Sequence, residues 1–402
     1  MNKNIKLAVA GAVLALSASA ANAGIIIPAG EWTLDINGNV NAFANYTKSD
    51  NSEFSTSGSN TASAALATGR GTGPQADKAI GINTGLLPAW LGFTGTTRQN
   101  DVDVSFTISM QPNVSDNGAA GDDSTPKNRQ AFLTFGDKSW GSVKLGKDIG
   151  IFASDAILND MTLLGVGAGA AQSGAKTTLG GIGTGYIYAA WKGQIAYTTP
   201  NFNGFQATVG ITNPNQGLPN DGTSYNQDRF GLEGKASYSF SADNFSGKVW
   251  ISGATYDNQY SPTRSYTISA GDIGATVTAG PATLTGYWYN GKGLGTTLFG
   301  ANGYNTTSLT TRDSDGGYIQ AKYATPFKTV IGLAYGVSNL DMSGNDAAAT
   351  SLESNERYTV GLYHPLTKHL NLVAEFNNVQ SETHSGLQNE SKTYSAGGIL
   401  FF

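Results

Sequence analysis

Apolar residues alternate with polar or small residues along this chain up to its last residue. In the segment 370–377, for example, Leu370, Leu372 and Phe376 lie on one face of an extended chain. A period of two predicts β-strands, and no long stretch after residue 23 keeps the 3.6 period of a helix. That part of the chain also lacks an apolar run of the roughly 20 residues that a spanning helix needs. In a membrane it can therefore form only a closed barrel, in which neighbouring strands satisfy every backbone group.

The composition favours a β-rich membrane protein over other classes. Only 13% of the 402 residues are charged, against roughly 25% in a typical soluble domain. The 17 Phe, 18 Tyr and 6 Trp are too many for a disordered chain. The absence of cysteine excludes disulfides, thiolate metal sites and cysteine nucleophiles. The net charge of -5 gives no sign of a nucleic-acid partner.

Residues 1–23 have the three parts of a secretory signal peptide. Two lysines precede an apolar run from Leu7 to Ala20, and Ala21-Asn22-Ala23 is a small-x-small cleavage site. The apolar run is short for a membrane anchor. We therefore expect an exported protein whose mature chain is 24–402.

Two kinds of break, short and long, separate the segments of alternating polarity, and a short break always comes between two long ones. The seven short breaks are 98–100, 137–139, 200–203, 242–244, 280–281, 326–327 and 365–368. The eight long polar breaks are about 48–77, 113–127, 150–188, 214–227, 258–263, 291–313, 340–354 and 381–390. They predict sixteen antiparallel strands with both termini on the short-turn side, which is the asymmetry of outer-membrane barrels. A soluble β-sandwich or propeller is the alternative, but it would carry more charge and less regular turns.

The last strand ends in an aromatic residue, Phe402, with Leu400 and Tyr394 on the same face. This end resembles the C-terminal signal by which bacterial outer-membrane proteins are recognised for insertion, which implies barrel-assembly machinery as a partner. An aromatic at this position also suits the periplasmic interface girdle.

Five segments, in order along the chain, resemble the Gram-negative general porins. They are WTLDINGNVNAFANY (from Trp32), AWLGFTG (89–95), RQAFLTFGDKSWGSVKLGKDIGIF (129–152), IAYTTPNFNGFQATVGI (195–211) and YTVGLYHPLTKHLNLVAEF (358–376). The resemblance implies a trimeric, sixteen-stranded transmembrane barrel. It also implies that the third external loop, here about residues 150–188, folds into the barrel and narrows it.

The resemblance further suggests which residues line the constriction. Lys147 falls where the family has a constriction arginine, and Asp160 falls where it has a loop carboxylate. Four positions depart from the enterobacterial pattern of basic residues and a second carboxylate: Asn39, Trp90, Thr198 and Leu164. These departures predict a weak transverse field and weak ion selectivity, with Trp90 shaping the pore.

The charges at the constriction predict a mild preference for cations. Asp155 and Asp160 against Lys147 leave a slight acidic excess, and fixed charges set ion preference in narrow pores. The alternative is structural: either aspartate could instead anchor the loop and never meet the permeant.

The sequence offers no pattern for catalysis or cofactor binding. The three histidines, His364, His369 and His384, fall on two sides of the membrane in the predicted topology. The glycine-rich runs from Gly165 and Gly180 do not follow a strand and open a helix, as a phosphate loop would. Asp122 and Asp123 could bind Ca²⁺, although adjacent carboxylates are usually a solvated loop tip.

Aromatic residues at strand ends are expected in interface girdles. Tyr287, Trp288 and Tyr289 are candidates for the external girdle. A track of aromatic residues for sugars is the alternative interpretation.

We therefore expect an outer-membrane porin that forms a passive, water-filled channel for small hydrophilic solutes and ions, with no enzymatic activity, cofactor or metal. Its expected partners are two further copies of the chain, membrane lipid and lipopolysaccharide, and the assembly machinery. The alternatives are a channel selective for sugars or organic acids, and a non-conducting adhesin or barrel-embedded hydrolase.

Overall fold

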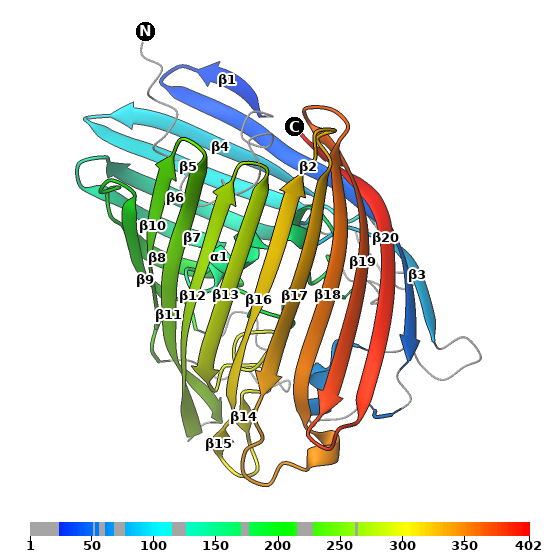
Figure 1. Cartoon of the computed structure of the whole chain (residues 1–402). Coiled ribbons are helices and arrows are strands. Elements are labelled where there is room, and N and C mark those ends of the chain that lie inside the picture. Colours follow the sequence, from blue (N-terminus) through cyan, green and yellow to red (C-terminus); the bar gives the residue numbers. More distant parts are fainter. Residues whose placement is uncertain are drawn as a thin grey trace.

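The computed structural model describes residues 24–50, 53–55, 61–67, 77–114, 126–169, 177–214, 228–261 and 264–402. These residues form an antiparallel barrel with helical segments inside it and at one end (Figure 1). The predicted signal peptide, the Asp122-Asp123 pair and most of the second external loop lie outside the described residues. No helix among the described residues is long and apolar enough to cross a membrane.

The wall consists of strands joined to their sequence neighbours. They are β1 (Ile25–Ala29), β2 (Trp32–Asp50), β3 (Lys78–Asn83), β4 (Trp90–Gln99), β5 (Val102–Gln111), β6 (Lys127–Asp137), β7 (Gly141–Ile149), β8 (Trp191–Thr198), β9 (Phe205–Thr212), β10 (Gly231–Ala242), β11 (Phe245–Ser261), β12 (Arg264–Ala279), β13 (Ala282–Lys292), β16 (Asp313–Ala324), β17 (Val330–Leu340), β18 (Leu352–Pro365), β19 (Leu370–Thr383) and β20 (Gln388–Phe401). Five elements of the described chain are not part of the wall. They are the β14–β15 hairpin (Tyr304–Asn305, Thr310–Thr311), the helix α1 (Ser154–Asn159) and the 3₁₀ turns η3 (Thr61–Ala64), η5 (Met161–Leu164) and η6 (Ala348–Thr350).

β2 closes the barrel. On one edge it pairs with β20, from Asn39 opposite Phe401 to Asp50 opposite Glu390. On the other edge it pairs first with β4 and then with β3, so these two strands share one position in the wall. β1 pairs with β2 beyond the end of β20 and shares the position of that strand. The 18 strands of the sheet therefore fill sixteen wall positions, which confirms the predicted fold.

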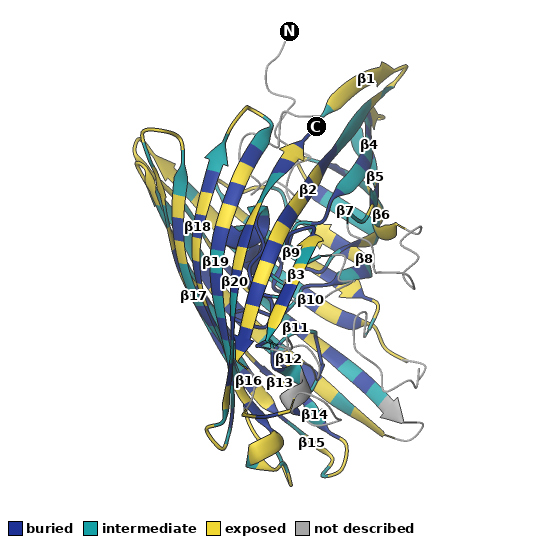
Figure 2. Ribbon diagram, turned by 90° about the vertical axis from the view of Figure 1, so that its right-hand side faces the viewer, coloured by how far each residue is buried: buried dark blue, intermediate teal, exposed yellow. Residues whose placement is uncertain are grey.

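The period-two pattern places polar side chains inside the barrel and apolar ones outside. Along β2, Asn39, Asn41 and Thr47 are buried, whereas Val40 and Tyr46 between them are exposed. Figure 2 shows the same alternation of buried and exposed positions on neighbouring strands. The exposed apolar residues form the outer band that faces lipid.

The structure corrects the predicted strand boundaries in two places. β11 and β12 extend to Ser261 and from Arg264, and β19 and β20 extend to Thr383 and from Gln388, so the fifth and eighth breaks are short, not long. Above the bilayer both faces of a strand meet water, so the apolar half of the alternation disappears there and the strand resembles a polar loop.

Two further features were not predicted. β1 is apolar on both faces and gives no alternation, and its turn into β2 is tight. The segment 84–89 interrupts the wall between β3 and β4 without any polar break in the sequence. It turns inward, where Thr84, Leu86 and Ala89 are buried.

Candidate constriction of the lumen

The third external loop, between β7 and β8, lies within the barrel. Two wall glutamates bind its backbone. The Glu233 carboxylate on β10 accepts hydrogen bonds from Ile151 N (2.6 Å) and Phe152 N (3.1 Å). The Glu375 carboxylate on β19 accepts from Val166 N and Gly167 N, both at 2.9 Å. The loop is therefore attached to the wall at two separate places by buried carboxylates that wall side chains also hold, Tyr256 at Glu233 and Tyr363 at Glu375.

An apolar core lies between this loop and the wall. Phe152, Ile157 and Tyr186 of the loop belong to one buried cluster with wall residues such as Trp250 and Tyr318. The ring of Tyr186 meets that of Tyr318 edge to face, with centroids 5.8 Å apart. Burial of this many aromatic and aliphatic side chains strongly disfavours displacement of the loop from the lumen.

The predicted external girdle is wrong for two of its three residues. Tyr287 and Tyr289 are buried and belong to the same inner cluster, where the Tyr287 hydroxyl donates to the Asp272 carboxylate (3.1 Å). Trp288, on the opposite face of β13, is exposed. Successive side chains of a strand point to opposite faces, so Tyr287 and Tyr289 face the lumen while Trp288 between them faces outward.

The inward segment 84–89 packs on the other side of the loop. Leu86 N donates to Gly165 O (2.9 Å), and Asn41 accepts from Gly85 N (2.8 Å). A Cβ on Gly85 would lie 2.0 Å from Gly165 O, so only glycine permits this approach. Asn39, one of the departures noted in the sequence, donates to Pro88 O (3.0 Å) and so supports this segment.

Asp155, on α1, faces two lysines of the wall. Lys235 on β10 lies 3.0 Å from one carboxylate oxygen and also donates to Ser154 Oγ (3.0 Å). Lys248 on β11 pairs with the other oxygen. Burial opposes ionisation of Asp155, but the two lysines outweigh it and hold the pKa of the carboxyl below its usual value. The carboxylate is therefore ionised and sits between two cations.

Asp160 has a different environment, although it is only five positions away. It accepts hydrogen bonds from Thr162 N (2.9 Å), Gly181 N (2.8 Å) and the Tyr186 hydroxyl (2.8 Å). Arg357 of β18 is 3.9 Å away. Burial, and then the neighbouring carboxylate, raise the pKa of Tyr186 well above its usual value, so this hydroxyl remains a donor. These partners connect the two halves of the loop.

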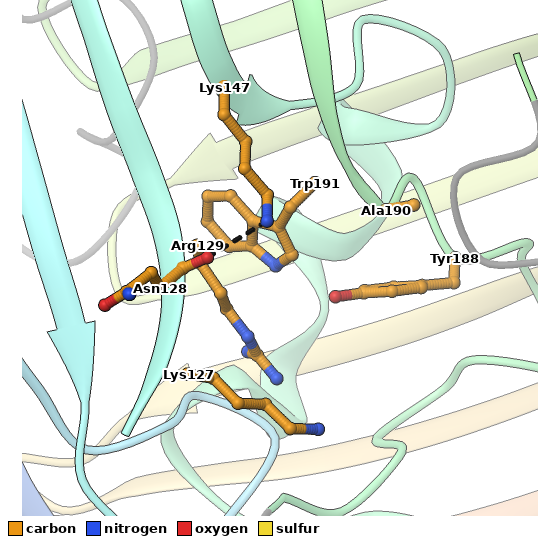
Figure 3. Close-up of a pocket in the computed structure, with 7 residues that line it drawn as sticks. All are labelled: Lys127, Asn128, Arg129, Lys147, Tyr188, Ala190 and Trp191. Carbon is orange, nitrogen blue, oxygen red and sulfur yellow. Dashed lines mark hydrogen bonds between the residues drawn. The ribbon is translucent and has the colours of Figure 1, made fainter. Parts of the chain in front are cut away.

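Lys147 lies apart from both aspartates. Its Nζ donates to Asn128 O (3.0 Å) in a pocket that Lys127, Arg129 and Trp191 also line (Figure 3). Lys147 is opposite Ala131 on β6, and the neighbouring pair, Leu133 and Leu145, belongs to the same outward face.

The remaining predicted residues lie at different levels of the barrel. Trp90 pairs with Asn39 on the inner face and packs against the loop core. Thr198 bonds to the Thr208 hydroxyl (2.9 Å), and Leu164 packs beside a second buried cluster. Phe402 exchanges backbone hydrogen bonds with Gly38 and completes the closure of the barrel.

The most informative functional residues were not predicted from the sequence. They are charged residues within the wall strands: Lys144, Lys192, Glu233, Lys235, Lys248, Lys322, Arg357 and Glu375. Their signal was available, because an ionisable residue at bilayer depth in a barrel strand must face the lumen. Reading strand parity around each charge would have identified them.

Comparison with known proteins now decides the family. A family model described as Gram-negative porin matches residues 9–384. The chain belongs to the Gram-negative porin family. Family and fold together make it an outer-membrane channel for small solutes, and they favour a channel over an enzyme. A search of curated proteins finds no match.

Several solved structures have the same fold at low sequence identity. The outer membrane channel DcaP of Acinetobacter baumannii is 17% identical with a TM-score of 0.66, over 94% of this chain and 100% of that chain. An anion-selective porin from Comamonas acidovorans is 14% identical with a TM-score of 0.60, over 92% and 100%. Salmonella typhi OmpF, in complex with daunomycin, is 15% identical with a TM-score of 0.58, over 94% and 100%.

Proposed function

We propose that this porin is a passive diffusion channel whose constriction weakly prefers anions. One observation carries the proposal: in the pairs that Asp155 forms with Lys235 and Lys248, and in the Lys144–Asp148 pair, the lysine is the more exposed partner. The side chains of Lys235 and Lys248 are 22% and 32% exposed, against 7% for Asp155. Lys144 is 21% exposed and its partner Asp148 is 1% exposed.

The exposed end of an ion pair acts most strongly on a passing ion. Two lysines share the single carboxylate of Asp155, so this group carries a net positive charge. Asp160 adds little to the field of the pore, because it is buried and bound by loop donors. The cation preference expected from the sequence rested on two carboxylates, Asp155 and Asp160, and one cation, Lys147. It did not include Lys235 and Lys248.

The test is the reversal potential of the purified protein in a planar bilayer under a KCl gradient. The double variant K235Q/K248Q should shift this potential towards cations, because it removes the exposed positive charges and leaves Asp155. The control is K147Q, which should leave the potential unchanged because Lys147 lies on the outward face of β7. An unchanged potential in K235Q/K248Q, or a shift in K147Q, would overturn the proposal.

Further parts of the proposal concern assembly and location. The chain is exported with cleavage after Ala23, is inserted by the assembly machinery through its Phe402 end, and forms a homotrimer in contact with outer-membrane lipid. The similar OmpT of Vibrio cholerae, 13% identical, has been described in a trimer form, which supports the trimer.

We also propose that the protein has no catalytic cycle. His364 binds the Thr329 hydroxyl (3.0 Å) near a short turn, and His384 binds Leu340 O (2.8 Å) in the last external loop. These two histidines therefore lie at opposite ends of the barrel.

A further inference from the structure

The wall contains three extra residues between β3 and β4. Asn83 at the end of β3 lies opposite Phe43 of β2, and Trp90 at the start of β4 lies opposite Asn39. β2 has three residues between these two partners, whereas the facing chain has the six residues 84–89. Surplus residues in one strand must leave the sheet locally. Here they turn into the lumen, as the burial of the segment shows.

The wall holds this segment through two asparagines of β2. Asn39 donates to Pro88 O (3.0 Å). Asn41 donates to Leu87 O (3.0 Å) and accepts from Gly85 N (2.8 Å). Both asparagines lie on the inner face of β2, and their exposed fractions are 0% and 1%. The segment therefore covers the inner face of the wall at this height.

The opposite side of the segment is attached to the third loop. Leu86 N donates to Gly165 O (2.9 Å), and Gly85 O accepts from Thr178 N (3.1 Å). The Leu86 side chain belongs to the same buried cluster as Leu163 of the loop. These contacts connect the loop to the β2 side of the wall, so backbone and apolar side chains occupy the space between them.

The region around α1, at the beginning of the third loop, differs in both exposure and charge. Lys235 and Lys248 of the wall pair with Asp155 of α1, and both lysines are partly exposed. The lumen is therefore filled and uncharged beside Asn39 and Asn41, and it is accessible and basic beside β10 and β11.

We propose that segment 84–89 sets the size limit of the channel. It closes the space between the third loop and the β2 side of the wall, so that solutes pass only beside α1. The segment thereby also directs permeant ions past Lys235 and Lys248. The inference rests on the channel in the proposed function, but not on the sign of its ion selectivity.

The test is deletion of residues 86–88. The deletion leaves three residues between Asn83 and Trp90, which matches β2 and keeps both residues on their present face. In a planar bilayer the single-channel conductance of the full-length variant should rise about twofold, because a second passage of similar width opens beside the first. Neutral polyethylene glycols that the unmodified protein excludes should enter liposomes that contain the variant.

A point substitution tests the same contact with less change to the wall. A Cβ on Gly85 would lie 2.0 Å from Gly165 O, so G85A forces the segment away from the loop. We expect its conductance to rise, but by less than in the deletion variant. The matched control is G286A on β13, where a Cβ meets nothing within 4 Å and the conductance should stay that of the unmodified protein.

The outcomes separate this inference from the proposed function. A folded deletion variant, identified by its heat-dependent migration in SDS gels, with unchanged conductance and size limit would overturn the inference. An equal rise in G85A and G286A would also overturn it. If the deletion prevents folding, G85A decides: a higher conductance supports the inference, and an unchanged one overturns it. The proposed preference for anions fails through a different measurement, the reversal potential of the unmodified protein.

Discussion

Two regions of the third loop each carry one aspartate, and they hold it in different ways. Around α1, the partners of Asp155 are Lys235 and Lys248, which belong to the wall and remain partly exposed. Beyond α1, Asp160 accepts hydrogen bonds from backbone N–H groups and a tyrosine of the loop itself, and its one charged partner on the wall, Arg357, is buried and 3.9 Å away. The first carboxylate contributes to the field of the pore, and the second contributes to the fold of the loop. Residue type and loop position alone do not distinguish these roles.

Replacing Asp160 should have the largest effect on stability. D160A leaves the Thr162 N–H and the Tyr186 hydroxyl without their acceptor, and it leaves Gly181 N with only its 3.3 Å bond to the Tyr186 hydroxyl. Each buried donor that loses its acceptor costs about 1–3 kcal/mol. We expect the free energy of unfolding to fall by about 2–4 kcal/mol, measured by denaturant titration with tryptophan fluorescence. A change below about 0.5 kcal/mol, the range of ordinary surface substitutions, would contradict the anchoring role.

Replacing Asp155 should instead change selectivity. D155N leaves Lys235 and Lys248 in place without their carboxylate, and both lysines can be solvated because they are partly exposed. We expect a reversal potential shifted further towards anions and a loss of stability of about 1 kcal/mol. D160N is the matched control, with the same change of charge on the same loop. An equal shift in the two variants would remove the distinction between the two regions.

The contribution of the Tyr186 hydroxyl to the binding of Asp160 can be measured separately. Y186F removes one of three donors to this carboxylate and keeps the ring that packs on Tyr318. We expect a loss of about 1 kcal/mol in the free energy of unfolding, with no change in reversal potential. A loss as large as that of D160A would mean that the tyrosine alone determines the stability of the loop.

The smallest expected effect is the dependence on pH. The pKa of Asp155 lies below its usual value because of the two lysines, after the opposing effect of burial. A carboxyl with a lowered pKa stabilises the fold above its unfolded value of about 3.9, and this contribution is lost as pH falls through the folded pKa. Selectivity should therefore stay constant from pH 7 to about pH 4 and shift towards anions below it. A shift that begins near pH 6 would contradict this assignment.

The fold could be predicted from the sequence because its signals are local. Alternation along each strand fixes the two faces, and the short turns fix the order of the strands. The resemblance at 129–152 also located the inward loop, which begins after Ile149. The signals failed where the environment removes the alternation, as in the extended ends of β11 and β19 above the membrane.

The site was harder to predict because it depends on contacts between distant segments. Lys235 and Asp155 are 80 positions apart, and only the path of the loop within the barrel brings them together. Lys147 shows how sensitive such assignments are, since a difference of one residue moves a side chain from the lumen to the outer face. Its neighbour Asp148 is the residue that points inward.

The sign of the reversal potential of the unmodified protein tests the central claim most directly. It should be measured in a planar bilayer with a KCl gradient at neutral pH, where Asp155 is ionised. The exposed lysines at the constriction predict a small potential of the sign that marks chloride as the more permeant ion. A potential that marks potassium as the more permeant ion would contradict the assignment of Lys235 and Lys248 as the charges that govern the pore.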